Sequence, residues 1–136
     1  MSKKKKKDNP ISSTKDPRFR SFLMSHLRRA SRFWRPSDVC IEESKIVRGC
    51  HKCNLCQKTF KRKDMKKDHK DPVVPVSGFT TWDEIIERLF VGKEGWQAIC
   101  QECHTKKTNE ENEQRKALKK EKAVLKYFSK KVKEEN

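Results

Sequence analysis

Four cysteines and three nearby polar residues have the types and spacing that metal binding and proton transfer require. The cysteines form two Cys-x-x-Cys pairs, Cys53 with Cys56 and Cys100 with Cys103. Two such pairs match the ligand spacing of a tetrahedral zinc site, in which four thiolates leave no open coordination position. We therefore expect a structural Zn²⁺ at these four cysteines, and we assign any catalysis to other groups.

Two further cysteines need a separate interpretation. Cys50 lies three residues before Cys53, so the segment holds two overlapping Cys-x-x-Cys spacings, and spacing alone does not choose between them. A second metal-binding mode through Cys50 and His51 stays open. Cys40 has no partner at a metal-binding spacing, so we interpret it as a small buried hydrophobic residue.

The three polar residues lie beside the cysteine pairs. Asp68 and His69 follow the first pair, and His104 follows Cys103 directly. Each alone would be an ordinary solvated residue, but a closed zinc site would bring their segments together. Histidine accepts protons near neutral pH, and carboxylate and imidazole groups bind divalent cations. We predict phosphodiester hydrolysis with His69 as general base and with Asp68 and His104 as ligands of one Mg²⁺ or Mn²⁺ ion, another divalent transition metal being the alternative.

This arrangement resembles the zinc-containing HNH endonucleases, many of which are encoded by phages. In that family an Asp-His pair ends a strand and a Cys-x-x-Cys-His segment opens a helix, as Asp68-His69 and Cys100 to His104 would here. The resemblance implies a ββα-metal fold and a cytoplasmic, DNA-associated enzyme. It implies nicking or double-strand cutting of DNA that leaves 5′-phosphate ends. It also favours Cys53 and Cys56 over Cys50 as ligands.

One residue departs from the family pattern. The middle Asn of the family name should lie about five residues before Cys100, where this chain has Gly95. In members that keep the final histidine as a ligand, that Asn mainly braces the loop between the strands. Gln97 and Asn54 are candidates for the bracing role. The departure favours the alternative function, a catalytically inactive zinc-ribbon protein that binds nucleic acid or another protein.

The composition limits the size of the core. Of 136 residues, 32% are hydrophobic and 40% are charged, so a metal is the natural staple for a small core. We see no secretory signal and no membrane-spanning segment, and we expect metal ligation in a reducing compartment rather than disulfides. The expected fold is α+β, a small ββα-metal (HNH) core stapled by a four-cysteine zinc site with flanking N- and C-terminal helices.

The net charge of +16 predicts a polyanionic partner. Residues 1–35 hold 12 Lys or Arg against two acidic residues, so most of the excess lies near the N-terminus. We expect contact with double-stranded DNA and no membrane binding, because the basic segment lacks a broad aromatic face. Solvated surface charge is the alternative. The expected DNA-binding residues are Arg28, Arg29, Arg32, Lys61, Arg62, Lys63, Lys66 and Lys67.

Four segments are expected along the chain. Residues 1–15 read as a disordered basic arm, residues 16–49 as a basic helical arm, residues 50–112 as the zinc-stapled nuclease domain, and residues 113–136 as a C-terminal helix. Within the helical arm, Asp16-Pro17 is expected to open one helix. Ser37 is expected to cap a second helix that ends near Arg48 and Gly49.

The nuclease segment is expected to begin with a β-hairpin over residues 59–70. Thr81 is expected to cap a core helix that runs to about Val91, and residues 96–100 read as a second strand. Thr108 and Glu111 read as the capping box of the last helix. That helix carries an apolar stripe, which either packs within the same chain, as we expect, or forms a homodimer.

Overall fold

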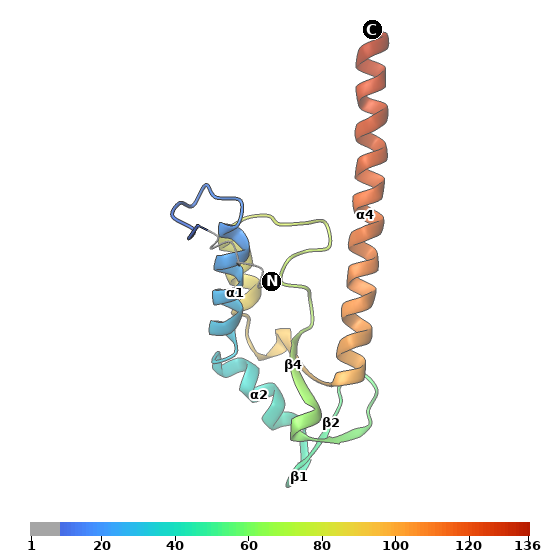
Figure 1. The fold of residues 1–136 in the computed structure, drawn as a ribbon. Helices are drawn as coiled ribbons and strands as arrows, with labels where there is room; N and C mark the ends of the chain where they lie inside the picture. Colours follow the sequence, from blue (N-terminus) through green and yellow to red (C-terminus); the bar gives the residue numbers. More distant parts are fainter. Residues whose placement is uncertain (1–8) are drawn as a thin grey trace, which may run out of the picture.

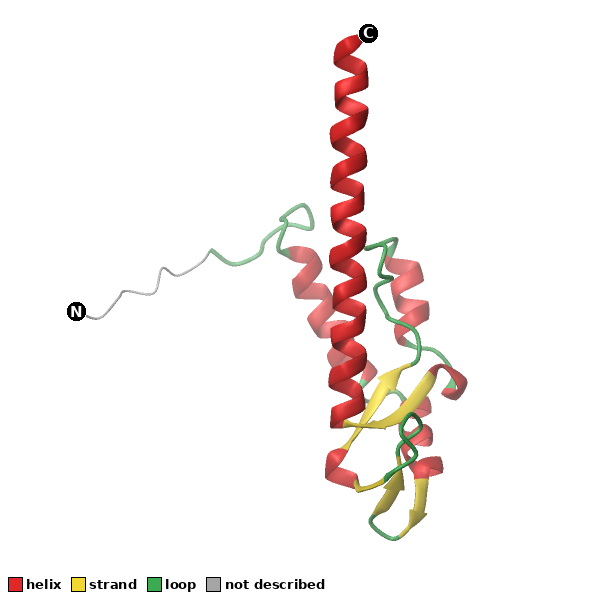
Figure 2. Ribbon diagram, turned by 90° about the vertical axis from the view of Figure 1, so that its right-hand side faces the viewer, coloured by secondary structure: helices red, strands yellow, loops and turns green. Residues whose placement is uncertain are grey.

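The computed structural model describes residues 9–136, which form an α+β fold with small sheets among the helices (Figures 1 and 2). The lysine run of the expected N-terminal arm, Lys3 to Lys7, lies outside the described residues, and residues 9–18 contain no helix or strand. The helices are α1 (Phe19–Ser31), α2 (Arg35–Ser44), α3 (Trp82–Leu89) and α4 (Gln101–Glu135), with 3₁₀ turns η1 (Arg62–Asp64) and η2 (Lys93–Gly95). The strands are β1 (Lys45–Val47), β2 (Cys50–Lys52), β3 (Thr59–Lys61), β4 (Met65–His69) and β5 (Trp96–Cys100).

The strands form two antiparallel sheets. β1, β2 and β3 make one sheet in that order, and β4 pairs with β5 in the other, where Asp68 lies opposite Gln97. The hairpin predicted over residues 59–70 is therefore wrong, because its two halves belong to different sheets. All five residues of β5 are buried and Met65 of β4 packs into the same core, so β5 gives β4 an apolar partner that the mostly exposed β3 does not.

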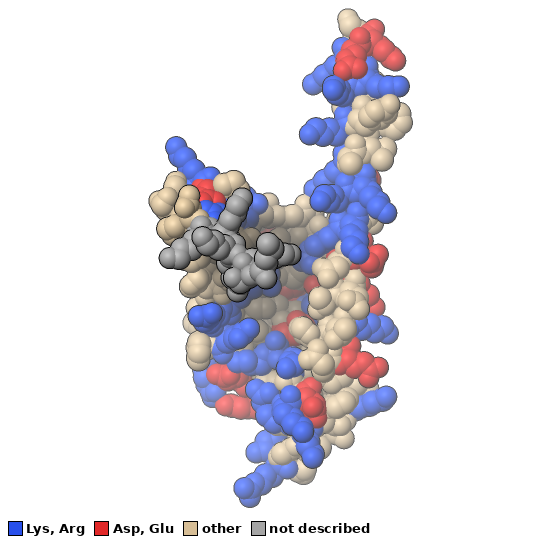
Figure 3. Space-filling view, viewed as in Figure 1, with Lys and Arg blue, Asp and Glu red and all other residues tan. Residues whose placement is uncertain are grey.

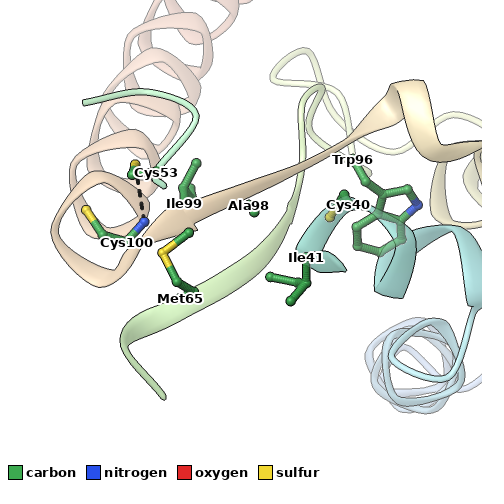
Figure 4. Close-up of a cluster of buried hydrophobic side chains, with 8 residues drawn as sticks. All are labelled: Cys40, Ile41, Cys53, Met65, Trp96, Ala98, Ile99 and Cys100. Atoms are coloured by element: carbon green, nitrogen blue, oxygen red, sulfur yellow. Dashed lines mark hydrogen bonds between the residues drawn. The ribbon is translucent and has the colours of Figure 1, made fainter. Parts of the chain in front are cut away.

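Two apolar clusters hold the fold together. The first joins α2, β4, β5 and the first cysteine pair (Figure 4), and it consists of Cys40, Ile41, Cys53, Met65, Trp96, Ala98, Ile99 and Cys100. The second packs α1 against α3 through Met24, Val73, Ile85 and Leu89. The predicted core helix is confirmed, since the side chain of Thr81 accepts a hydrogen bond from the Glu84 N–H and both Ile85 and Leu89 are fully buried.

The basic arm differs from its prediction at both helices. Asp16 does not cap α1, because its carboxylate binds the backbone N–H and guanidinium of Arg18 in the turn before the helix. Ser37 lies inside α2 and donates to the Trp34 carbonyl. α2 ends at Ser44 rather than near Arg48, and the β-branched residues that follow it form the edge strand β1.

The last helix begins earlier than expected. The Cys100 sulfur accepts a hydrogen bond from the Cys103 N–H at the N-terminus of α4, so the helix starts at Gln101. Thr108 and Glu111 therefore lie inside one continuous helix and do not form a capping box. The helix spans parts of both the expected nuclease domain and the expected C-terminal segment.

The far half of α4 extends away from the rest of the fold (Figures 1 and 2). Its large apolar side chains are exposed, so the expected packing of this stripe within the same chain is wrong. These exposed residues are Val124, Leu125, Tyr127, Phe128 and Val132. Pairing of the stripe with a second copy stays a prediction. Within residues 9–136, none of the helices combines the length and apolar character needed to cross a membrane.

Candidate metal centre and active site

Four cysteine sulfurs meet at one point of the fold. The sulfurs of Cys53, Cys56, Cys100 and Cys103 all lie within 4.8 Å of one another. Cys53 and Cys56 come from the turn after β2, Cys100 ends β5, and Cys103 lies in the first turn of α4. The predicted positions are confirmed as a cluster that can hold a metal ion such as zinc.

Backbone groups prepare the cluster for a cation. Burial raises the pKa of the Cys53 thiol, but N–H donors from Cys56, Cys100 and Leu55 outweigh it and lower that pKa to about 6. Hydrogen bonding to Cys100 raises the pKa of Cys103 to about 12. Four thiolates this close repel one another, and a divalent ion removes that repulsion, so the donor set fits Zn²⁺.

The remaining cysteines lie outside the cluster. The Cys40 thiol donates to the Ser37 carbonyl at 3.0 Å, and burial raises its pKa to about 11, which confirms it as a buried small residue. His51 is buried, and its Nδ1 lies 3.0 Å from Ser44 Oγ and 3.2 Å from the Ile41 carbonyl oxygen. His51 therefore ties β2 to α2, and neither it nor Cys50 joins the metal cluster.

Asp68 and His104 face each other beside the cysteine cluster. Oδ1 of Asp68 lies 3.8 Å from Nε2 of His104, although one residue is near the end of a strand and the other is in the first turn of a helix. Oδ2 of Asp68 accepts a hydrogen bond from Gln97 Nε2 at 2.9 Å and contacts Lys107 Nζ at 3.1 Å. One carboxylate oxygen is thus saturated by the protein, and the other is directed at an imidazole.

The His69 ring lies on the other face of β4, since successive strand residues point to opposite faces. Its Nε2 is 2.9 Å from the Leu89 carbonyl oxygen, and its ring centroid is 3.8 Å from that of Trp96. A carbonyl cannot donate, so Nε2 carries the hydrogen and Nδ1 is the acceptor of the neutral ring. Burial lowers the His69 pKa, which favours that neutral form.

Lys107 contacts both the Asp68 carboxylate and the main chain of His69. Its ammonium donates to the His69 carbonyl at 3.0 Å and to Glu111 at 2.6 Å, in addition to its contact with Asp68. Burial opposes the charged form, but Glu111 and Asp68 outweigh it and raise the Lys107 pKa. Sequence reasoning missed Lys107 and Glu111, although their four-residue spacing on a helix that starts at Gln101 is a detectable signal.

Gly95 has a steric role in the turn before β5. Its carbonyl accepts a hydrogen bond from the Lys70 N–H at 2.9 Å, which extends the β4–β5 pairing by one link. A Cβ at this position would overlap Cγ2 of Val91 and lie 2.9 Å from Val91 Cβ, so an Asn side chain does not fit. The two candidate bracing residues both contact the sheet. Gln97 binds Asp68, and Asn54 Oδ1 accepts from the Ala98 N–H.

The basic residues predicted to bind DNA divide into two groups. Lys67 is largely occupied, because its ammonium donates to the Arg32 carbonyl at 2.8 Å and to Asp38 at 2.9 Å. Arg28 lies close enough to His69 for its charge to lower the His69 pKa. Arg28 belongs to the exposed group, whose other members are Arg29, Arg32, Lys61, Arg62, Lys63 and Lys66. Figure 3 shows Lys and Arg side chains along α4 and at the lower end of the molecule.

The site therefore combines a thiol cluster, a carboxylate facing an imidazole, and a second imidazole whose acceptor nitrogen has no hydrogen bond within residues 9–136. These groups suit metal binding and proton transfer from water. Comparison of the chain with protein-family models, with curated proteins and with solved structures found no match.

Proposed function

We propose that this protein is a metal-dependent DNA endonuclease of the HNH type, which hydrolyses phosphodiester bonds in double-stranded DNA. The observation that carries the proposal is the approach of Asp68 to His104 beside the cysteine cluster, with His69 next along the same strand. Hydrolysis at a phosphate requires a cation-binding pair and a proton acceptor near each other. The charge of Asp68 acts on the His69 ring, although the two side chains leave β4 on opposite faces.

The residues of the chain divide the chemical work. Asp68 and His104 would hold one Mg²⁺ or Mn²⁺ ion, and the softer imidazole ligand favours Mn²⁺ in that pair. When bound, the cation would supply positive charge to the phosphate and to the departing 3′ oxygen. His69 would take the proton of the attacking water at Nδ1, because the Leu89 carbonyl holds the hydrogen on Nε2.

The zinc ion has a structural role in this proposal. Four thiolates fill its coordination, so it would fix the turn after β2 against β5 and α4 without entering the reaction. The exposed arginines and lysines would bind DNA phosphates on either side of the cut.

A second function is a catalytically inactive zinc-ribbon protein that binds nucleic acid. The observation that favours it is the environment of His69. Its Nε2 bonds to a main-chain carbonyl and its ring packs on Trp96, as a purely structural histidine would do.

Cleavage of supercoiled plasmid by the purified, zinc-loaded protein with Mg²⁺ or Mn²⁺ separates the two functions. We expect nicked or linear DNA with 5′-phosphate ends, and we expect its loss in His69→Ala. His26→Ala is the matched control, because His26 is an exposed histidine of α1. Zinc content and circular dichroism should be unchanged in both variants. Binding without cleavage under every divalent ion would refute the nuclease and leave the binding protein.

A further inference from the structure

A three-residue charge chain adjoins the proposed cation site. Lys107 Nζ lies 3.1 Å from Oδ2 of Asp68 and 2.6 Å from Oε1 of Glu111. The three side chains are mostly buried, with exposed fractions of 15% for Asp68, 20% for Lys107 and 19% for Glu111. Their charges are therefore weakly screened by solvent.

Lys107 and the proposed cation would use different oxygens of Asp68. Oδ1 faces His104, and Oδ2 carries Lys107 together with Gln97. A cation on the Oδ1 side would thus bind without displacing the ammonium. It would nevertheless lie within a few ångströms of a positive charge, and that repulsion opposes its binding.

Glu111 offsets this repulsion. One ammonium between two carboxylates leaves the chain Asp68, Lys107 and Glu111 with a net charge of −1. A divalent cation would change that charge to +1, and a DNA phosphodiester, which carries one negative charge, would bring the whole assembly to neutrality.

We infer that the Lys107–Glu111 pair sets the affinity of the catalytic cation, so that the ion is held weakly by the free protein and firmly only when a DNA phosphate completes the charge balance. This inference rests on the proposed function. It assigns Lys107 and Glu111 as positioning residues that act through Asp68. Neither residue needs to touch the substrate.

The inference makes opposite predictions for the two residues. Lys107→Met removes the competing positive charge, so Mn²⁺ should bind about tenfold more tightly or better. Glu111→Gln leaves that charge uncompensated, so Mn²⁺ should bind about tenfold more weakly or worse. In the double variant Asp68 alone supplies the net charge of −1, so its affinity should return to within about threefold of the wild type.

The measurement is a Mn²⁺ titration of the zinc-loaded, full-length chain, with the free ion detected by electron paramagnetic resonance. Asp68→Asn removes the proposed carboxylate ligand, so the Mn²⁺ binding that this variant loses is the binding at the proposed site. Lys106→Met and Glu110→Gln are matched controls, because they repeat the same charge changes on exposed side chains one residue earlier on α4. Circular dichroism and zinc content verify that every variant is folded.

Opposite shifts in the two single variants, larger than those of the matched controls, support the inference. Weaker Mn²⁺ binding in both single variants would overturn it, because a purely structural pair gives that result. Shifts no larger than those of Lys106→Met and Glu110→Gln would also overturn it. If the wild type binds no more Mn²⁺ than Asp68→Asn, the cation site itself is refuted, and the proposed function fails with it.

Discussion

Gln97 Nε2 donates a 2.9 Å hydrogen bond to Oδ2 of Asp68, its direct neighbour across the β4–β5 pairing. Gln97 is buried, so it braces the carboxylate from inside the fold. The hydrogen bond leaves Oδ1 as the oxygen that faces His104. Gln97 thus supports the site from the strand, while Lys107 supports it from α4.

On the proposed function, Gln97→Leu should therefore lower plasmid cleavage by about 10- to 100-fold, the usual effect of removing a hydrogen bond to a metal ligand, which is the role proposed for Asp68. The substitution keeps a side chain of similar size, and the rate of appearance of nicked plasmid measures its effect. Gln101→Leu is the control, because Gln101 is exposed on α4 and, within the described part of the chain, its side chain hydrogen-bonds only to Thr105. Equal rates in the two variants would contradict the bracing role.

The parts of the site that the sequence predicts are those set by short spacing. Each Cys-x-x-Cys pair fixes its own geometry over one turn, so a four-cysteine site could be predicted without any knowledge of the fold, whereas the choice of Cys53 and Cys56 over Cys50 came from the family resemblance. The Thr81 cap is equally local, since it depends on a hydrogen bond to an N–H three residues later.

The parts that the sequence did not predict depend on distant contacts. Whether β4 pairs with β3 or with β5 is decided by burial against Met65 and its neighbours, and a local hairpin pattern contains no information on that choice. The start of α4 is set by Cys100, whose sulfur caps the helix as well as joining the metal cluster. The expected helix start near Thr108 leaves Lys107 outside the helix, so the sequence alone does not identify Lys107 and Glu111 as neighbours of Asp68.

Removal of zinc should unfold the centre of the protein, because Cys53 and Cys100 belong to the same buried cluster as Met65 and Trp96. We expect a strong chelator to lower the melting temperature of the protein, which circular dichroism measures. Cys53→Ser should release zinc and have the same effect.

Cys50→Ser provides the control for the zinc experiment. Cys50 is a partly exposed cysteine in the same segment but outside the cluster of four sulfurs. We expect it to keep one zinc per chain and a nearly unchanged melting temperature. Zinc loss as large as that of Cys53→Ser would show that the cluster uses Cys50 instead.

Gly95→Ala should destabilise the fold by about 1–3 kcal/mol, the usual cost of inserting a methyl group into a filled space. The new Cβ would overlap the Val91 side chain, whereas a Cβ at Gly92 would meet only the end of the flexible Glu94 side chain. Gly92→Ala is therefore the matched control and should cost much less. Urea unfolding measures the free energy of unfolding of both variants. The double variant Gly95→Ala with Val91→Ala should recover part of the stability that Gly95→Ala loses.

Lys67→Met should reduce stability and change DNA binding little. The Lys67 ammonium joins β4 to α1 and α2 through the Arg32 carbonyl and Asp38, and we expect its removal to cost roughly 1 kcal/mol in urea unfolding at neutral pH. Lys66→Met is the neighbouring control, because Lys66 is exposed on the same strand. On the proposed function, it should leave stability unchanged but weaken DNA binding and reduce the salt dependence of that binding.

The stability difference between Lys67→Met and the wild type should also depend on pH. The hydrogen bond from Lys67 holds the pKa of Asp38 in the folded chain below its ordinary value. At neutral pH the Asp38 carboxylate is charged in both the folded and the unfolded chain, so the Lys67–Asp38 pair contributes its full stabilisation there. As the pH falls below about 4, the ordinary pKa of Asp, the unfolded chain takes up the proton first and the contribution declines. We therefore expect the difference between the two free energies of unfolding to stay unchanged from neutral pH down to about pH 5 and to shrink as the pH falls below about 4. A difference that stays constant over this range would mean that the Arg32 carbonyl, rather than Asp38, is the partner through which Lys67 stabilises the fold.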